Sequence, residues 1–432
     1  MHLMSFDRIS RKFTAKINNT VTAAIDIGSD KILCLIVRNI ISENNKYSFD
    51  ILGIGHNRSM GFESGIITDP AALELAIRTS IQAAEEMSSL TVDKIVVNIS
   101  SEAIESNLYE ISVPIKDTQV SKKDIETAFM IAEEQNVSDD KVIIETMPLG
   151  FSIDGVRSIE DPVGMYGKKL DINISVITCK RSIVQNLNNV IENAHAKISK
   201  IIISPFASAI ATLSSDEANL GTILIDMGAG TTSYSVFSDG IFKYAGVSPI
   251  GGNYITKDIA RTLSIPIVEA EKLKILYGGV LTNSYDNGDL LNMKMVGYEG
   301  SDGNDIQISK SIIAEISRTR ALDIFQKVRD NLINVSESLI HNKRIVLTGG
   351  GSQLIGIDDL AGEVFNSPIR RAVPQISSEI FDISDPIFSN VIGLLTYSQN
   401  ETFVNKKITT QSLSYNSNNF FSNLLKWFRD SF

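Results

Sequence analysis

The most constraining feature of this sequence is a strand-end pattern that occurs twice. The run Ile25-Asp-Ile-Gly-Ser29 closes one apolar stretch, and Ile225-Asp-Met-Gly-Ala-Gly-Thr-Thr232 closes another, with the two aspartates at positions 26 and 226. An alternating apolar run follows each copy, over residues 31–37 and 233–237, which is typical of a strand that returns as a hairpin partner. The repeat therefore predicts two similar strand–turn–strand units in one chain.

The residue types in these two turns suit a polyphosphate ligand. A strand-end aspartate can hold a Mg²⁺-bound water, glycines let backbone amides approach an anion, and hydroxyl groups donate to phosphate oxygens. Two such turns facing each other would enclose a triphosphate. Asp-x-Gly is also a common turn, so one copy alone would favour an ordinary loop. The second copy in a matching strand context favours the phosphate interpretation.

The rest of the chain alternates short β-rich runs with helical patterns, which predicts layered α/β structure. Asp69 precedes a first-turn proline and an apolar pattern at helical spacing, which predicts a helix to about Met87. Ser121, with an acid three residues later, has the pattern of a capping box. Residues 283–304 are rich in Asn, Asp and Gly and predict a loop. Strands are expected over residues 23–26, 95–99, 110–113, 142–147, 172–178, 200–203, 222–226 and 344–348.

Two further glycine clusters lie in the second half of the chain. Thr348-Gly-Gly-Gly-Ser352 follows an apolar strand, where it either permits close contact with a flat ligand such as adenine or forms only a tight loop. Ile250-Gly-Gly-Asn253 opens a helix that we expect to continue to Lys274. Glu271 and Lys274 are three residues apart and share a helix face, as a solvated ion pair or as a ribose-binding pair.

Composition excludes several other classes of protein. With 40 Lys and Arg against 51 Asp and Glu, the net charge of -11 disfavours a nucleic-acid partner, because such binding requires neutralised phosphates. Cys34 and Cys179 have neither metal-ligand spacing nor a disulfide framework, which indicates a reducing cytosol. No apolar run approaches the length of a membrane span, and the first residues lack the compact apolar stretch of a secretory signal. Metalloprotease, hydrolase-elbow and P-loop motifs are absent from the sequence.

The last residues differ in character from the rest. Residues 400–419 are rich in Asn, Ser, Thr and Lys and predict a flexible linker, whereas residues 420–432 return to aromatic side chains. On a helical wheel the apolar residues of this tail share one side. Such a helix can cap a groove of its own domain, but the linker, the aromatic density and the cations on the polar side favour a membrane interface. The side chains expected to face the membrane are Phe420, Phe421, Leu424, Leu425, Trp427, Phe428 and Phe432.

Together these motifs resemble the actin and heat-shock-chaperone ATPase superfamily, and more closely its FtsA family of bacterial cell-division proteins. The resemblance covers about residues 21–398 and the tail. Beyond the glycine turns, the family-like segments are Gly65-Ile-Ile-Thr-Asp69, Glu145-Thr-Met-Pro148 with Gly164-Met-Tyr-Gly167, Ser204-Pro-Phe-Ala-Ser-Ala209, the run 221–252 and Asn390-Val-Ile-Gly-Leu-Leu-Thr-Tyr397.

The resemblance implies an α/β, actin-like two-lobed ATPase fold with duplicated cores, an inserted small α+β domain and a C-terminal amphipathic helix. The expected layout is a mobile arm over 1–20, lobe 1 over 21–100, 179–206 and 386–399, an inserted subdomain over 101–178, the lobe 2 core over 207–249 and 320–385, an outer subdomain over 250–319, a linker over 400–419 and a membrane-targeting helix over 420–432.

By the same resemblance the site would bind ATP and Mg²⁺. Asp26 and Asp226 would hold Mg²⁺ through water, and Asp226 would also position the attacking water. Several relatives in the superfamily have a carboxylate where Ser204 precedes Pro205, and because a hydroxyl is a poor base we expect tight ATP binding with at most slow hydrolysis. The first phosphate loop would be Asp26, Gly28, Ser29 and Lys31, the second Asp226, Gly228, Gly230, Thr231 and Thr232, and the nucleoside would lie among Gly252, Glu271, Lys274, Gly349, Gly350, Gly351 and Ser352.

The function implied by the resemblance is that of a membrane-tethered adaptor. It would self-associate into a polymer on the cytoplasmic face of the inner membrane, at the division septum. There it would bind the C-terminal peptide of FtsZ through the outer subdomain, and later division proteins through the inserted one. The alternative is a soluble sugar or metabolite kinase on the same fold. A kinase needs an acid beside the transferred phosphate, and no sugar-specific signature is apparent.

Overall fold

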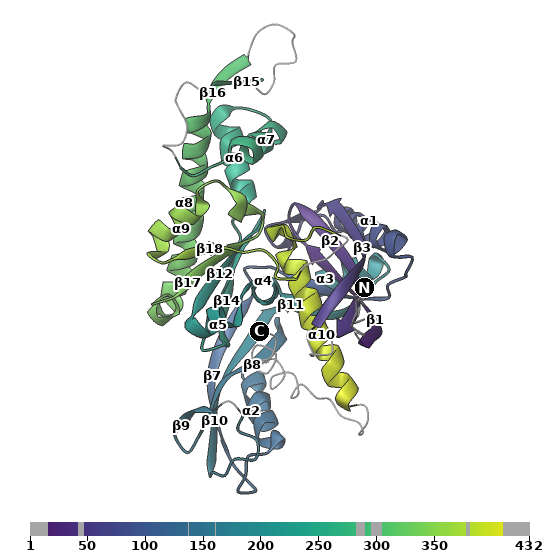
Figure 1. Ribbon diagram of the computed structural model, residues 1–432, viewed down its shortest axis with the longest axis vertical. Coiled ribbons are helices and arrows are strands. Elements are labelled where there is room, and N and C mark those ends of the chain that lie inside the picture. The colour runs from purple at the N-terminus through teal and green to yellow at the C-terminus, as the bar shows by residue number, and fades with distance from the viewer. Residues whose placement is uncertain are drawn as a thin grey trace, which may run out of the picture.

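The computed structural model describes residues 16–41, 47–136, 138–159, 161–281, 290–294, 305–376 and 381–408. Two five-stranded sheets form the centres of two lobes, and helices pack around and between them (Figure 1). A four-stranded sheet lies at one end of the long axis, and a small helical subdomain lies at the other end (Figure 1). The α/β class and the two lobes predicted from the sequence are confirmed.

The sheet of lobe 1 has the strand order β11-β6-β1-β2-β3. Its antiparallel half comprises β1, β2 and β3, and its parallel half adds β6 and β11 to β1. The strands are β1 (Lys16–Ile27), β2 (Lys31–Ile41), β3 (Tyr47–Arg58), β6 (Lys94–Ile99) and β11 (Lys197–Ile203). The small hairpin β4 (Phe62–Glu63) and β5 (Ile66–Ile67) and the helices α1 (Pro70–Ser88) and α3 (Arg181–Asn193) complete the lobe.

The sheet of lobe 2 has the same plan, with the order β14-β13-β12-β17-β18. Again three antiparallel strands are followed by two parallel ones. The strands are β12 (Thr222–Met227), β13 (Thr232–Ser238), β14 (Ile241–Ser248), β17 (Arg344–Thr348) and β18 (Ile369–Arg371). The helices of this lobe are α5 (Ser215–Leu220), α8 (Lys310–Val335), α9 (Ile357–Phe365) and the 3₁₀ segments η2 (Glu337–Leu339), η3 (Gly350–Gln353) and η4 (Pro386–Phe388).

The repeat seen in the sequence is a repeat of turn geometry. In the β1–β2 turn the amide of Gly28 donates to the carbonyl of Lys31 at 3.0 Å, and in the β12–β13 turn Gly228 donates to Thr231 at 2.9 Å. Each aspartate lies in the central strand of its sheet, two residues before the glycine. Both predicted hairpins are therefore confirmed.

Two helices, α4 (Ser204–Thr212) and α10 (Ser389–Ile408), join the lobes. The helix α10 packs on α4 and on β1 and β6 of lobe 1, whereas α4 also contacts β12, β13 and β14 of lobe 2. A Cβ atom on Gly393 would lie 1.8 Å from the carbonyl oxygen of Ala207, so the two helix backbones touch where they cross. Phe206 then packs edge-on against Tyr397, with 5.8 Å between the ring centroids. This crossing fixes how the two helices pass between the lobes.

The inserted subdomain is a four-stranded antiparallel sheet, in the order β7-β10-β8-β9, with one helix against it. The capping box predicted at Ser121 is present, and its partner is Asp124. The elements are β7 (Glu105–Pro114), α2 (Lys122–Glu134), β8 (Lys141–Ile153), β9 (Val156–Ile159) and β10 (Lys169–Lys180).

The outer subdomain corrects two expectations. The helix expected to run from the Gly251 turn to Lys274 is two helices, α6 (Gly252–Leu263) and α7 (Ile267–Tyr277). The chain breaks between them because Ser264 adopts the left-handed conformation, with φ of 54°, and Pro266 follows. The loop expected over 283–304 contains the strand β15 (Leu290–Lys294), which pairs with β16 (Asp305–Ser309).

The two ends of the core also extend further than predicted. The strand β1 begins at Lys16 and pairs with β2 there, so the expected arm over 1–20 is too long by five residues. The helix α10 runs to Ile408, so the first part of the linker expected over 400–419 is helical. Extending a formed helix is easier than starting one, which explains why polar residues continue it. The remainder of the linker and the tail helix over 420–432, with its seven apolar side chains, lie outside the described residues.

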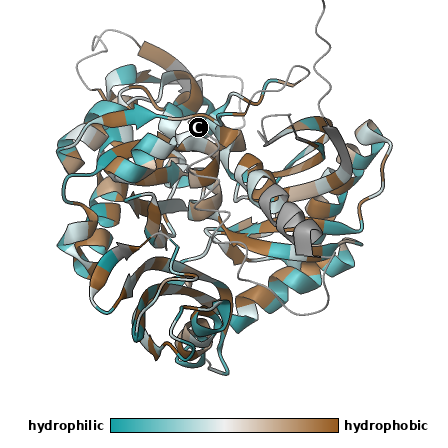
Figure 2. Cartoon of the chain, turned by 60° about the horizontal axis from the view of Figure 1, so that its bottom comes forward, coloured by the Kyte–Doolittle hydropathy of each residue, from teal (hydrophilic) through white to brown (hydrophobic). Residues whose placement is uncertain are grey.

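The hydrophobic core connects the parts that the site depends on. One cluster of buried residues joins lobe 1, the inserted subdomain and the helices α4 and α10, and another fills lobe 2 beneath α6, α8 and α9. Hydrophobic residues are concentrated in the strands, and the helices alternate between hydrophobic and hydrophilic segments (Figure 2). Within the described ranges no helix combines the length and the apolar character that a bilayer crossing requires.

The helix crossing leads to a first prediction. Gly393→Ala places a methyl group against the backbone of Ala207, so α10 must move away from α4. We expect the free energy of unfolding to fall by about 1–3 kcal/mol in urea denaturation. The matched control is Gly150→Ala on β8, where a Cβ meets nothing within 4 Å. Equal stability of the two variants would contradict the tight crossing.

Candidate functional site

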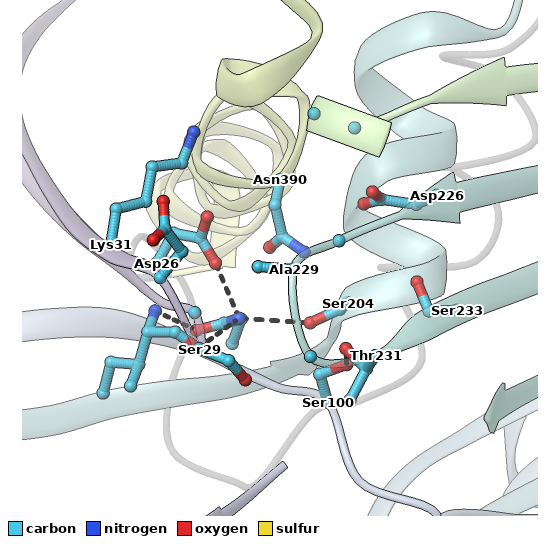
Figure 3. Close-up of a pocket in the computed structure, with 18 of the residues that line it drawn as sticks. Asp26, Ser29, Lys31, Ser100, Ser204, Asp226, Ala229, Thr231, Ser233 and Asn390 are labelled. Carbon is cyan, nitrogen blue, oxygen red and sulfur yellow. Dashed lines mark hydrogen bonds between the residues drawn. The ribbon is translucent and has the colours of Figure 1, made fainter. Parts of the chain in front are cut away.

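A cavity of about 160 Å³ lies where the two glycine turns face each other (Figure 3). The turn after β1 and the turn after β12 form opposite walls, and the first residues of α4 and α10 form another. The ends of strands from both lobes and the first residues of the joining helices thus line one cavity. Of the residues predicted from the sequence, it is lined by Asp26, Gly28, Ser29, Lys31, Asp226, Gly228, Gly230, Thr231, Gly349 and Gly350.

The two turns touch each other across the cavity. A Cβ on Gly230 would lie 2.2 Å from the Oγ of Ser29. The two lobes can come this close only because Gly230 has no side chain. The hydroxyl groups of Ser100 and Thr231 lie 3.0 Å apart and form a second contact between the lobes. The backbone amide of Ser64 donates to the Oγ of Ser29 at 3.1 Å. These contacts hold the two glycine turns against each other at the cleft.

Asp26 is held by an amide side chain from the neighbouring parallel strand. The Nδ2 of Asn98 donates to the carboxylate of Asp26 at 2.7 Å and to the hydroxyl of Ser204 at 3.1 Å, while its Oδ1 accepts from the amide of Ile27 at 2.7 Å. Burial raises the pKa of Asp26 to about 7, a rise that Lys31 opposes and Asp226 reinforces. The carboxylate is therefore costly to ionise without a cation.

Asp226 occupies the equivalent position in lobe 2. The hydroxyl of Ser208 donates to its Oδ2 at 2.5 Å, and burial raises the pKa of this carboxyl as well. A Cβ on Gly349 would lie 2.2 Å from the Oδ1 of Asp226, and Gly349 has φ of 80°, so this position requires glycine. Lys31 donates to the carbonyl of Ile387 at 3.2 Å, and burial lowers its pKa against the pull of the nearby acids.

These side chains fit a hydrated divalent cation. Two buried carboxylates in one cavity repel each other, and a cation between them removes that cost. No group of three or more acidic, histidine or cysteine side chains that could hold a metal occurs in the part of the chain that the structure describes. Mg²⁺ commonly keeps several waters and uses only one or two carboxylates. Asp26 and Asp226 are thus suited to binding Mg²⁺ through its water shell.

The other predicted residues lie beside the cavity, in lobe 2. Thr232 donates its hydroxyl to the carbonyl of Ile250 at 2.7 Å, and Ser352 donates to Gly349 at 2.7 Å, so both shape turns. Glu271 and Lys274 form the ion pair that their spacing predicts, at 2.8 Å, and Lys274 also donates to the carbonyl of Gly252 at 3.4 Å. The residues outside the cavity lining are Thr232, Gly252, Glu271, Lys274, Gly351 and Ser352.

Sequence reasoning missed several residues of the cavity wall. Asn98 and Ser100 come at the end of β6, which runs parallel to β1. Carboxyl ends of parallel strands meet at one edge of a sheet, and applying that rule to 95–99 would have found them. Asn390 on α10 and Phe62 on β4 also line the cavity. They depend on packing between distant segments, and no local pattern indicates them.

The raised pKa of Asp26 gives a second prediction. Between its ordinary value of 3.8 and about 7, the folded protein binds more protons than the unfolded chain, so the stability contributed by this carboxyl is lost as pH rises to about 7. Asp26→Asn keeps an acceptor for Asn98 and removes the buried charge. We expect the nucleotide-free variant to exceed the original protein in unfolding free energy, by a margin that grows by roughly 2–3 kcal/mol between about pH 5 and about pH 8.

Urea denaturation across this pH range measures that margin. Asp30→Asn, which removes an exposed carboxylate from the same turn, is the control and should change the unfolding free energy little. A margin for Asp26→Asn that stays constant with pH would contradict the account of this carboxyl.

Comparison with known proteins assigns the chain to a family. The family model described as "Cell division protein FtsA" matches residues 223–393, and the model described as "SHS2 domain inserted in FTSA" matches residues 101–178. A cell division protein FtsA of Agrobacterium fabrum is 36% identical over 386 residues, which cover 88% of this chain and 87% of that protein. A cell division protein FtsA of Neisseria meningitidis is 33% identical over 375 residues, covering 86% and 89%.

Solved structures with low identity show the fold. A PilM–PilN type IV pilus biogenesis complex superposes with a TM-score of 0.61 at 18% identity, covering 88% of this chain and 98% of that chain. MreB5 of Spiroplasma citri bound to ADP superposes with a TM-score of 0.53 at 14% identity, covering 90% and 99%. The fold is therefore the actin-like one that the motifs predicted. With the paired turns, the inserted subdomain and relatives matched over most of their length, the chain belongs to the FtsA family of cell-division proteins.

Proposed function

We propose that this protein binds ATP with Mg²⁺ in the cleft between its lobes. The observation that carries the proposal is the pair of equivalent turns, each with an aspartate two residues before its glycine, lining one cavity. Backbone amides of glycine turns and the starts of α4 and α10 attract phosphate, while the two carboxylates attract the cation. MreB5 of Spiroplasma citri, which shares the fold, has been solved bound to ADP and to AMPPNP.

The cavity is large enough for only part of the nucleotide. At about 160 Å³ it is smaller than the roughly 300 Å³ or more of a typical ligand pocket, so it suits the phosphates and the cation. The nucleoside would then lie beside it, against the η3 turn and the Glu271–Lys274 pair on α7. The amide of Gly252 bonds to the carbonyl of Gly228 at 2.9 Å, which keeps this group of residues next to the second phosphate turn.

Hydrolysis would be slow at such a site. Ser204 is 1% exposed and its hydroxyl already accepts from Asn98, so it can place a water but is a weak base at neutral pH. Asp226, the residue expected to position that water, is engaged by Ser208. Appreciable steady-state turnover by pure, polymer-forming protein would contradict this part of the proposal.

A third prediction tests the cleft itself. Gly230→Ala introduces a methyl group between Ser29 and the backbone of Ser64, which separates the two turns. We expect ATP affinity to fall at least about tenfold in calorimetric titration with Mg²⁺, because the displaced turn can no longer donate hydrogen bonds to the phosphates. Gly362→Ala on α9, where a Cβ would make only ordinary contacts at 3.7 and 3.8 Å, should bind ATP like the original protein. Unchanged affinity in Gly230→Ala would place the nucleotide elsewhere.

We further propose that the protein is a membrane-tethered adaptor that polymerises at the septum and connects FtsZ to the cytoplasmic face of the inner membrane. Membership of the FtsA family supports this role and does not favour the metabolite-kinase alternative. The outer subdomain also offers an apolar surface for a peptide such as the FtsZ C-terminus. On α7 its exposed members are Ile267, Val268, Ile275 and Leu276.

We expect the inserted subdomain to contact later division proteins or other copies of this chain. Its apolar side chains at the surface include Val156 and Tyr166, exposed by 65% and 75%. Exposed apolar side chains of this kind are available for protein contacts. ATP-dependent self-association would bring many tails together, so that weak individual helices hold the polymer on the membrane by effective concentration.

Vesicle flotation gives the fourth prediction. With Mg²⁺ and ATP, the intact chain should float with anionic vesicles, and a chain ending at Asn419 should stay in solution, because it lacks the aromatic tail. A monomeric variant should bind vesicles far more weakly than the original protein. If the truncated chain floats as well as the intact one, the tail is not the membrane anchor.

A further inference from the structure

One buried polar atom in the cavity wall has no role in the ATP binding proposed so far. Asn390, the second residue of α10, lines the cavity and is only 8% exposed. Among the residues that the structure describes, none donates a hydrogen bond to its Oδ1. A buried amide oxygen without a donor is unfavourable, so a ligand that brings a donor would be stabilised there.

The position of Asn390 is fixed from both lobes. The preceding hydroxyl, on Ser389, lies 2.7 Å from the hydroxyl of Thr348 in lobe 2. Lys31 of lobe 1 donates to the carbonyl of Ile387 at 3.2 Å. One turn further along α10, Gly393 contacts the backbone of α4 and sets the rotation of the helix. The side chain of Asn390 is therefore held at the cavity by its surroundings.

The neighbours of Asn390 identify the kind of group that would satisfy it. In Figure 3, Asp26 lies on one side of Asn390 and Asp226 on the other, and all three residues line the same cavity. Carboxylates and phosphate oxygens only accept hydrogen bonds, so neither can supply the missing donor. The water shell of a divalent cation supplies donors to all three side chains at once.

We propose that the Oδ1 of Asn390 accepts a hydrogen bond from a water in the hydration shell of the nucleotide-bound Mg²⁺, so that α10 contributes a third acceptor to the cation site. This inference rests on the proposed binding of Mg²⁺ and ATP. It makes the start of α10 a part of the site that responds to the cation, whereas the glycine turns respond to the phosphates.

The test compares ATP affinity with Mg²⁺ and with EDTA, using the full chain and calorimetric titration. We expect Asn390→Ala to reduce the gain in affinity that Mg²⁺ produces by roughly five- to twenty-fold, with little change in EDTA. Asn390→Asp keeps an acceptor of the same shape, so it should retain or increase the Mg²⁺ gain. The control is Thr396→Val, which removes a buried hydroxyl bonded within α10, to Ile392, and should leave the gain unchanged.

Each other outcome overturns the inference in a distinct way. If Asn390→Ala keeps the original Mg²⁺ gain, the side chain does not contact the cation shell. If both Asn390 variants weaken ATP equally with and without Mg²⁺, the amide donates to phosphate instead. If the original protein binds no ATP under either condition, the proposed function fails together with this inference. Thermal unfolding of each variant shows that a loss of binding does not come from a loss of fold.

Discussion

The burial of two carboxylates in one cavity is the constraint on which the rest of the cleft depends. Asp26 and Asp226 are the penultimate residues of the central strands in two equivalent sheets, and both line one cavity, where burial raises the pKa of each. Neither carboxylate is left without a donor, since Asn98 serves the first and Ser208 the second. The remaining need is for positive charge. That need explains why the same cavity that offers amides to an anion also suits a cation.

The two joining helices make this arrangement sensitive to how the lobes pack. The helices α4 and α10 both begin at the cavity, and their backbones touch at Gly393 and Ala207. A ligand that bridges the turns would therefore also hold the start of α10. From that start the helix continues to Ile408, toward the segment that carries the aromatic tail. The helix α10 thus connects the proposed nucleotide site with Ile408, and the proposed membrane anchor follows later in the sequence.

Much of the fold was predictable because it depends on local rules. The duplicated Asp-x-Gly turns, the helix that begins after Asp69 and the capping box at Ser121 each follow from short patterns, and the structure contains all of them. The local pattern misled where a few residues interrupt it, as Ser264 and Pro266 do between α6 and α7. It also misled at the polar end of α10, where a linker was expected from residue 400.

The site was predictable mainly in its glycine turns. Glycine and aspartate at strand ends carry their own signal, so ten residues of the cavity lining were identified in advance. Asn98 reaches the cavity through strand pairing and lies 72 residues after Asp26 in the sequence. Asn390 reaches it through the helix crossing and lies 364 residues after Asp26. The hydroxyls of Thr232 and Ser352 bond to backbone carbonyls, and the contact of these two residues with the nucleotide stays a prediction. Residue type alone does not tell which way a hydroxyl points.

Hydrogen–deuterium exchange with and without Mg²⁺ and ATP tests the central claim most directly. If the nucleotide binds in the cleft, amides in both turns, near residues 26–31 and 226–232, and at the start of α10 should become protected together. Exchange that slows in one lobe only, or at neither turn, would contradict the account, because no single lobe contains the whole site.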